Sequence, residues 1–257
     1  MHSEAIGGHW ADIGPVPAPR AAGAHDRPPG YGRDMTAVTS RDLTSVPVVL
    51  LDLDGTVVES APGILAALEQ AFAACGEEHP GAERLQSFIG PPLVDSFRSE
   101  LGMDAERAEA LRLAYTDHYL AEGYRLSVPY AGMTELISGL RADGRTVAIA
   151  TNKPETTARR VLEHQGLAAD LDLIGGTDLA GGRTHKAQVI ASVLERLGVS
   201  AADGAVMVGD RLHDAEGAAV HGLEAVLVGW GYGGDAERAA DLPYAATVPE
   251  LHRMLRV

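Results

Sequence analysis

Nine residues decide the fold of this chain: Val48-Val49-Leu50-Leu51-Asp52-Leu53-Asp54-Gly55-Thr56. The four apolar residues at the start predict a fully buried strand, because the run is too short and too β-branched for a helix. The strand delivers two aspartates at positions i and i+2, which lie on the same side of an extended chain. Two like charges held together cost free energy unless a cation or a reaction uses them. An Asp-Gly pair alone indicates only a turn, but the whole string predicts a functional site at Asp52 and Asp54.

Further along the chain, apolar strand-like runs alternate with helical segments that end at glycines. Such alternation indicates a parallel sheet with helices on both faces, which is a doubly wound α/β core of the Rossmann-like kind. Ligands bind at the carboxyl ends of the strands in sheets of this type, and the first strand ends at Asp52. The expected strands are 146–150, 171–174, 205–208 and 225–228, and the expected helices are 133–140, 155–164, 186–197, 215–221 and 249–255.

A helical block separates the first strand from this alternating part. A helix is expected from Ser60 to Cys75, and residues 65–128 are predicted to be helical throughout. We interpret 65–128 as a helical cap inserted after the first strand, over the carboxyl edge of the sheet. Residues 46–64 and 129–257 then form the catalytic core. Residues 1–45 are rich in proline and glycine without apolar periodicity, so we expect a disordered tail there.

Two further positions carry polar residues that suit phosphate chemistry. The strand 146–150 ends in Thr151 and Asn152, whose hydroxyl and amide can donate to phosphate oxygens, although the pair could equally cap a helix. Lys186 opens a helix, where a cation is unfavourable with respect to the helix dipole, so a function is expected there. Binding a transferring phosphoryl group and offsetting the charge of Asp52 would supply that function.

A second acidic pair follows the strand 205–208. Asp210 comes directly after Gly209, and Asp214 follows four residues later, so both carboxylates can face one side. Acidic oxygens with few other ligands suit Mg²⁺, which keeps several waters and shares the phosphate of its substrate. A turn followed by a helix cap is the simpler alternative for Asp210 alone.

Taken in order along the chain, these pieces resemble the haloacid dehalogenase superfamily of phosphohydrolases, from Val46 to the end. The resemblance implies that Asp52 is a nucleophile that forms an aspartyl-phosphate and that Asp54 is the general acid and base. It also implies that Thr151, the Asn152 amide and Lys186 bind the phosphoryl oxygens. The implied Mg²⁺ ligands are Asp52, the backbone carbonyl of Asp54, Asp210 and Asp214.

The loop Phe88-Ile89-Gly90-Pro91-Pro92-Leu93 resembles the cap loop of the phosphoglycolate phosphatase-like branch, and Arg183, three residues before Lys186, fits the same branch. The resemblance implies that Gly90, Pro91 and Arg183 lie near the substrate. The branch commonly has an arginine where this chain has Thr116. If that arginine reads a second anionic group, a substrate carboxylate is put in doubt.

The expected activity is the hydrolysis of a small phosphorylated metabolite. A mycobacterial protein tyrosine kinase of the same fold is also similar to this chain. Transfer of phosphate from ATP to a protein tyrosine is therefore the alternative function, in which a protein would be the substrate.

The amino-acid composition limits the kinds of binding partner and the cellular compartment that we expect for this protein. The net charge is −15 without a long run of one sign, which argues against nucleic acid or an anionic membrane as partner. No stretch of about 18 apolar residues is present, so no transmembrane helix is expected. No secretory signal pattern is recognised at the N-terminus, and we expect a cytoplasmic enzyme. The single cysteine, Cys75, lies in an Ala-rich apolar helix and is expected to be a small residue of the hydrophobic core.

The lysine content is unusual, since Lys153 and Lys186 are the only two lysines beside nineteen arginines. A lysine in so arginine-rich a chain indicates a need for a compact ammonium. We assign that need to Lys186. Lys153, two residues past Thr151, is expected to face solvent.

Overall fold

The computed structural model describes residues 42–256. Residues 1–41 of the predicted tail lie outside the described residues. The last residues of the predicted tail, from position 42 to 45, belong to the packed domain, because Leu43–Ser45 forms a short 3-10 helix (η1) in which Leu43 is buried. The guanidinium of Arg145 donates hydrogen bonds to the backbone carbonyls of Leu43 and Thr44, which fixes this segment to the core. The domain therefore begins before residue 46.

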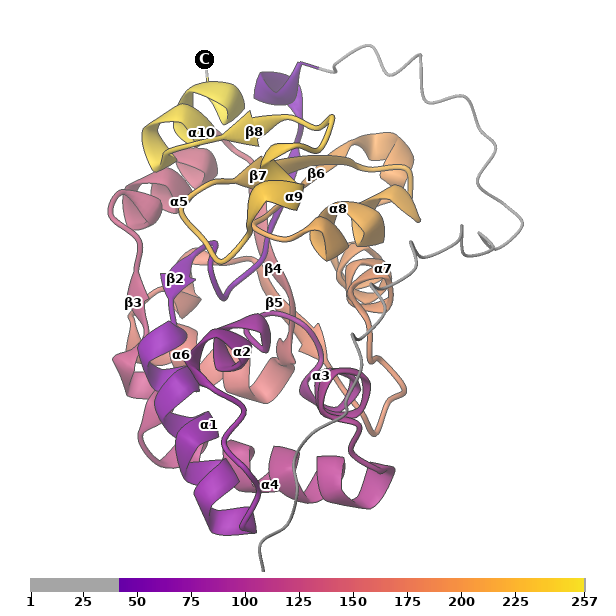
Figure 1. Ribbon diagram of the computed structural model, residues 1–257. Coiled ribbons are helices and arrows are strands. Elements are labelled where there is room, and N and C mark those ends of the chain that lie inside the picture. The colour runs from indigo at the N-terminus through magenta and orange to yellow at the C-terminus, as the bar shows by residue number, and fades with distance from the viewer. Residues whose placement is uncertain (1–41, 257) are drawn as a thin grey trace, which may run out of the picture. The chain divides into compact units, whose positions relative to one another are not determined.

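Six parallel strands form one sheet in the order β5-β4-β1-β6-β7-β8 (Figure 1). β1 lies in the interior of this sheet with β4 and β6 as its neighbours. The strand bounds are Val48–Leu51 (β1), Thr146–Pro154 (β4), Leu173–Thr177 (β5), Ala205–Gly209 (β6), Glu224–Val228 (β7) and Tyr244–Ala245 (β8). Successive strands extend the sheet to both sides of β1, so the predicted doubly wound topology is confirmed.

The two faces of the sheet belong to two separate hydrophobic clusters, because neighbouring side chains on a strand point to opposite faces. Val49 and Leu51 face the first cluster, and Val48 and Leu50 face the second. α5 (Met133–Ala142), α6 (Glu155–His164) and α10 (Val248–Leu255) cover the first face. α7 (Lys186–Leu197) and α8 (Leu212–Ala219) cover the second. Each side of β1 is thus completely buried, as its unbroken apolar run predicts.

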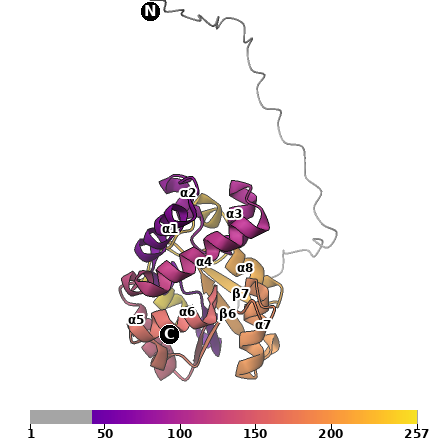
Figure 2. The same cartoon turned by 90° about the horizontal axis from the view of Figure 1, so that it is seen from below.

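The cap is connected to the core through a two-stranded antiparallel ribbon. β2 (Val58–Glu59) leads into the cap and pairs with β3 (Val128–Pro129), which leads out of it. The helices between them cover one end of the sheet (Figures 1 and 2). They are α1 (Ala61–Cys75), α2 (Ala82–Ser87), α3 (Leu93–Leu101), α4 (Ala105–Ala121) and the 3-10 helix η2 (Gly123–Leu126). The insertion therefore starts at the ribbon, a few residues before position 65.

Aromatic packing and one close helix approach hold the cap together. The ring of Phe97 meets those of Phe72 and Phe88 edge to face, with centroids 6.0 and 5.3 Å apart. Gly63 of α1 faces Gly123 of η2 so closely that a Cβ on Gly63 would lie 2.0 Å from the Gly123 carbonyl oxygen. Glycine is required there because any side chain would separate α1 from the end of the cap.

Several elements differ from the sequence prediction. β8 and α9 (Asp235–Arg238) lie between the expected strand 225–228 and the expected helix 249–255, and η3 (Ala168–Asp170) and η4 (Ala201–Asp203) are further short 3-10 helices. The prediction for Cys75 was wrong, because it is exposed at the end of α1. No helix among residues 42–256 is both long and apolar enough to cross a membrane.

Candidate active site

The loop after β1 places Asp52 and Asp54 at the carboxyl end of the sheet, in nearly enclosed positions that are 4% and 7% exposed. The backbone N–H of Asp52 donates to the Val208 carbonyl of β6 over 2.9 Å, which extends the sheet pairing to the first aspartate. Gly55 then turns the chain with φ +81°, and a Cβ at this position would lie 2.3 Å from Asp210 Oδ2. The glycine of the first motif is therefore needed both for the turn and for the approach of Asp210.

Lys186 lies at the centre of the buried charges. Its Nζ is 2.6 Å from Asp52 Oδ1, 2.7 Å from Asp214 Oδ1 and 2.8 Å from the Ala150 carbonyl oxygen. Burial lowers the pKa of this ammonium, but the carboxylates of Asp214 and Asp52 outweigh burial and leave the pKa above its ordinary value. Lys186 therefore remains charged and holds Asp52 in place, as the prediction for this lysine requires.

Three buried carboxylates, those of Asp52, Asp210 and Asp214, have oxygens that all lie within 4.8 Å of one another. Asp210 Oδ2 accepts a hydrogen bond of 2.6 Å from the Tyr232 backbone N–H, whereas its buried Oδ1 has no hydrogen-bond partner among residues 42–256. Burial, followed by the charges of Asp214 and Asp52, raises the pKa of Asp210 well above its ordinary value. Such a cluster costs free energy that a divalent cation would offset, so these residues fit a metal site.

The Asp54 carboxylate pairs with Lys153. The prediction that Lys153 faces solvent was wrong. Lys153 is 8% exposed, and its Nζ lies 3.0 and 2.8 Å from the two oxygens of Asp54. It also lies 4.5 Å from the centroid of the Tyr119 ring of the cap. Burial lowers the pKa of Lys153, but Asp54 outweighs it, so the pKa stands well above its ordinary value. The Asp54 carboxylate is paired with Lys153 and is not one of the three carboxylates of the acidic cluster, so the predicted metal contact of Asp54 stays with its backbone carbonyl.

Thr151 and Asn152 lie on the extended end of β4, beside the two aspartates. Both line the same cavity as Asp52 and Asp54, and Thr151 is 2% exposed. The Asn152 amide Nδ2 donates to the Gly90 carbonyl oxygen over 3.4 Å, and its buried Oδ1 has no partner in the part of the chain that the structure describes. The side chain of Asn152 is thus held between the core and the predicted cap loop.

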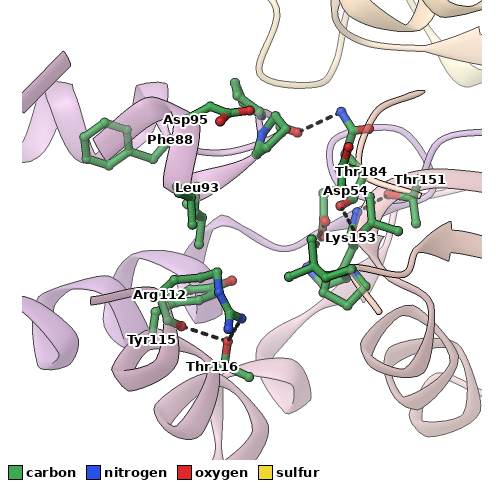
Figure 3. A pocket seen from close by; sticks show the side chains of 18 of the residues that line it. Asp54, Phe88, Leu93, Asp95, Arg112, Tyr115, Thr116, Thr151, Lys153 and Thr184 are labelled. Carbon is green, nitrogen blue, oxygen red and sulfur yellow. Dashed lines mark hydrogen bonds and ion pairs between the residues drawn. The ribbon is translucent and has the colours of Figure 1, made fainter. Parts of the chain in front are cut away.

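A cavity of about 410 Å³ lies between the cap and the ends of the strands (Figure 3). Gly90 and Pro91 line it, as predicted for the cap loop. Arg183 does not line it. The guanidinium of Arg183 instead donates to the Gly176 carbonyl oxygen and to Glu155, at 2.6 and 3.0 Å, and so braces the start of α6.

Three functional-looking residues were missed at the sequence level. Lys153 is one, and the continuation of β4 to Pro154 could have revealed it, since positions 151 and 153 share one side of a strand. Arg112 of α4 lines the cavity from the cap. The Tyr232 hydroxyl accepts hydrogen bonds from the backbone N–H groups of Ser60 and Ala61 and donates to Glu59 over 2.8 Å. Tyr232 thereby joins the loop beside Asp210 to the start of the cap, where the side chain of Ser60 makes no capping hydrogen bond to α1.

The chain matches the family model described as haloacid dehalogenase-like hydrolase over residues 49–228. It is 37% identical to the tyrosine-protein kinase PtkA of Mycobacterium tuberculosis, over 82% of this chain and 72% of that protein. The solved structure of PtkA superimposes with a TM-score of 0.71, and the match covers 82% of this chain and 99% of that one.

Two further relatives carry names of hydrolases. A 5'-nucleotidase of Pseudomonas aeruginosa is 35% identical over 81% of this chain and 95% of its own length. A phosphoglycolate phosphatase of Caulobacter vibrioides is 30% identical over 76% and 83%. The chain therefore belongs to the haloacid dehalogenase-like hydrolase family. Within that family it is a phosphatase, related to the phosphoglycolate phosphatases that the cap loop resembles.

Proposed function

We propose that this phosphatase hydrolyses a small phosphate monoester in a Mg²⁺-dependent reaction that proceeds through an aspartyl-phosphate. The observation that supports the proposal best is the arrangement of Asp52, Lys186 and the acidic pair Asp210 and Asp214. Asp52 is held by the Lys186 ammonium 2.6 Å away and lies beside the Asp210 carboxylate, whose Oδ1 has no hydrogen-bond partner among the described residues. A nucleophile, a cation for phosphoryl oxygens and a metal site thus meet at one strand end.

Asp52, Asp210 and Asp214 would hold the metal, with the backbone carbonyl of Asp54 as a further ligand. Bound Mg²⁺ would neutralise charge on the carboxylates and on the phosphoryl group. Lys186 would orient Asp52, and its Nζ would donate to a phosphoryl oxygen in place of one of its three present acceptors. The hydroxyl of Thr151 and the backbone amide of Asn152 would donate to the remaining oxygens.

In the first step, a carboxylate oxygen of Asp52 forms a bond to phosphorus as the bond from phosphorus to the ester oxygen breaks. The carboxyl of Asp54 gives its proton to the leaving oxygen. In the second step, water attacks phosphorus, the Asp54 carboxylate accepts the water proton, and the bond to Asp52 breaks to release inorganic phosphate.

Lys153 has a place in this cycle because it touches both oxygens of Asp54. Its ammonium fixes the position of the carboxyl group that the first step uses as an acid and the second step uses as a base.

The decisive experiment is phosphate release from a panel of small phosphate esters, with Mg²⁺ and after dialysis against EDTA. We expect activity with Mg²⁺ that vanishes in EDTA and returns on adding the metal. Mass spectrometry after rapid acid quench should find one phosphoryl group on the wild-type protein and none on Asp52→Asn. Full activity in EDTA, or activity of Asp52→Asn within tenfold of wild type, would remove the metal or the nucleophile from the proposal.

The 37% identity to PtkA supports a second candidate, transfer of phosphate from ATP to a protein tyrosine. The same Asp52 would carry the phosphoryl group, and a tyrosine hydroxyl would replace water. Incubation with labelled ATP and a tyrosine peptide separates the two functions. Label in the peptide supports transfer, and label in inorganic phosphate supports hydrolysis.

For the compartment we propose the cytoplasm. The exposed thiol of Cys75 has no disulfide partner in the chain, which suits a reducing environment.

A further inference from the structure

The cap end of the cavity carries an arginine that is already paired. The guanidinium of Arg112 donates two parallel hydrogen bonds, of 2.8 and 2.6 Å, to the carboxylate oxygens of Glu109. It also donates a longer one, of 3.4 Å, to the hydroxyl of Thr116. Figure 3 shows Arg112 and Thr116 across the cavity from Asp54 and Lys153. Arg112 would thus lie beside the organic part of a substrate whose phosphate is bound at Asp52.

The pairing changes what Arg112 can recognise. A free guanidinium would attract a second anionic group, such as a carboxylate. Here its two best donors are already occupied, and the hydrogen bond to Arg112 lowers the pKa of Glu109, so that both partners stay charged. A substrate carboxylate would have to displace Glu109 and would meet its negative charge. Asp95 lines the same cavity, so the cap contributes two carboxylates and one cation to the lining.

The ion pair of Arg112 and Glu109 is expected to contribute little to the stability of the protein. Glu109 is 47% exposed and Arg112 20% exposed, and exposed pairs of this i,i+3 kind stabilise a helix little. Much of the remaining wall on the cap side is apolar, with Ile64, Phe88, Leu93, Val94 and Tyr115. An apolar wall with an internally neutralised arginine suits an uncharged group that has apolar surface and hydrogen-bonding atoms.

We propose that Glu109 determines specificity by neutralising Arg112, so that the enzyme selects phosphate monoesters with an uncharged organic part over those with a second anionic group. This inference rests on the proposed phosphatase function. Position 116 of this chain is a threonine. The cation one helical turn earlier, Arg112, is paired with Glu109 and is therefore not available to a substrate carboxylate.

Matched substrates test the inference. Glycerol 3-phosphate and 3-phosphoglycerate differ in a hydroxymethyl group against a carboxylate, and phenyl phosphate and 4-carboxyphenyl phosphate form an aromatic pair. The ratio of kcat/KM within each pair is measured on the full chain with saturating Mg²⁺. Wild type should favour the uncharged member by about tenfold or more, since a substrate carboxylate would face the like charge of Glu109 and would have to displace it from Arg112.

Glu109→Gln keeps the size of the side chain and removes the charge that neutralises Arg112. It should move both ratios by about tenfold toward the carboxylate-bearing ester, mainly through KM. The double variant Glu109→Gln with Arg112→Met should lose this gain. Glu106→Gln is the matched control, because Glu106 is exposed on the same helix and does not line the cavity, and its ratios should equal those of wild type.

The two proposals fail in different ways. If the esters are hydrolysed but Glu109→Gln changes the ratios no more than Glu106→Gln, the specificity role is wrong and the phosphatase stands. A wild-type preference for the carboxylate-bearing members would also overturn the role of Glu109. If the wild type with Mg²⁺ hydrolyses none of the four esters or other small phosphate esters, the proposed function fails and the inference falls with it.

Discussion

The ammonium of Lys153 and the carboxylate of Asp54 form an enclosed ion pair, in which Nζ lies 2.8 and 3.0 Å from the two oxygens and the side chains are 6% and 9% exposed. The aromatic ring of Tyr119 covers the ammonium from the cap. The pair therefore connects the loop after β1, the end of β4 and helix α4. Its burial means that neither partner can be removed without leaving the other charge in a poor environment.

Replacing Lys153 with methionine should destabilise the protein by about 3–5 kcal/mol, the cost of leaving one member of a buried ion pair unpaired. Urea denaturation followed by circular dichroism measures the free energy of unfolding. Combining Lys153→Met with Asp54→Asn should recover much of the loss, because no charge then remains without a partner. Strictly additive effects of the two substitutions would show that the pair is not energetically coupled.

Asp54→Asn should slow the hydrolysis of alkyl phosphates far more than that of nitrophenyl phosphate, whose leaving group hardly needs a proton. General acid catalysis contributes about 10²–10⁴-fold to such reactions. Single-turnover measurements of the phosphorylation step give the two rates. An equal decrease for both classes of ester would contradict the assignment of Asp54 as the acid.

Lys186→Arg should reduce kcat/KM by about 10²-fold or more with little change in melting temperature. Lys186 Nζ fits between Asp52, Asp214 and the Ala150 carbonyl, and a planar guanidinium is wider and spreads its charge. Because Lys153 is buried, it does not serve as the mild control. The exposed Arg253 does, and Arg253→Lys should leave kcat/KM unchanged. A similar, small effect of both substitutions would show that Lys186 does not bind the phosphoryl group.

Mg²⁺ should raise the melting temperature of the substrate-free protein, because a ligand that binds only the folded state stabilises it by about 2.7 kcal/mol at a concentration of 100 Kd. Asp210→Asn should abolish this rise. The same variant should be at least as stable as wild type in EDTA, since it removes one of three crowded carboxylates. Differential scanning fluorimetry with and without the metal measures both effects. An unchanged response of Asp210→Asn to Mg²⁺ would place the metal elsewhere.

The link between α5 and the C-terminal segment should weaken in acid. Asp143 accepts hydrogen bonds of 2.5 and 2.9 Å from Arg256, and these bonds lower the pKa of the Asp143 carboxyl. A carboxyl with a lowered pKa stabilises the folded state above its unfolded pKa of about 3.9 and loses this contribution as the pH falls through the folded value. The melting temperature of Asp143→Asn should therefore lie below that of wild type at pH 7, and the difference should shrink below pH 4. A difference that is constant with pH would contradict a charge-based role.

The sequence predicted the α/β core, and it indicated that Asp52 and Asp210 meet at one edge of the sheet, for a local reason. Buried strands such as β1 show as unbroken apolar runs, and parallel pairing then brings the residues after β1 and β6 to one edge. Lys153 was misjudged because the expected strand ended at Ala150, whereas β4 continues to Pro154 and keeps positions 151 and 153 on one side. The pairing of Arg112 with Glu109 resembles any helix surface pair in sequence, and only the fold shows that it faces a cavity. β8 is two residues long and leaves no periodic signal.

The ribbon of β2 and β3 has a consequence for how such an enzyme can diversify. Val58 and Glu59 pair directly with Pro129 and Val128, so the chain leaves the core and returns to it at adjacent positions. Strands paired in this way are about 5 Å apart, so closing the interrupted core needs little more than a tight turn. Everything between these two strands can lengthen, shorten or be exchanged without altering the order of the six parallel strands. Under the proposed function, the residues that act on phosphate all lie outside the segment between β2 and β3, whereas this segment supplies much of the cavity wall. The two parts can therefore evolve at different speeds.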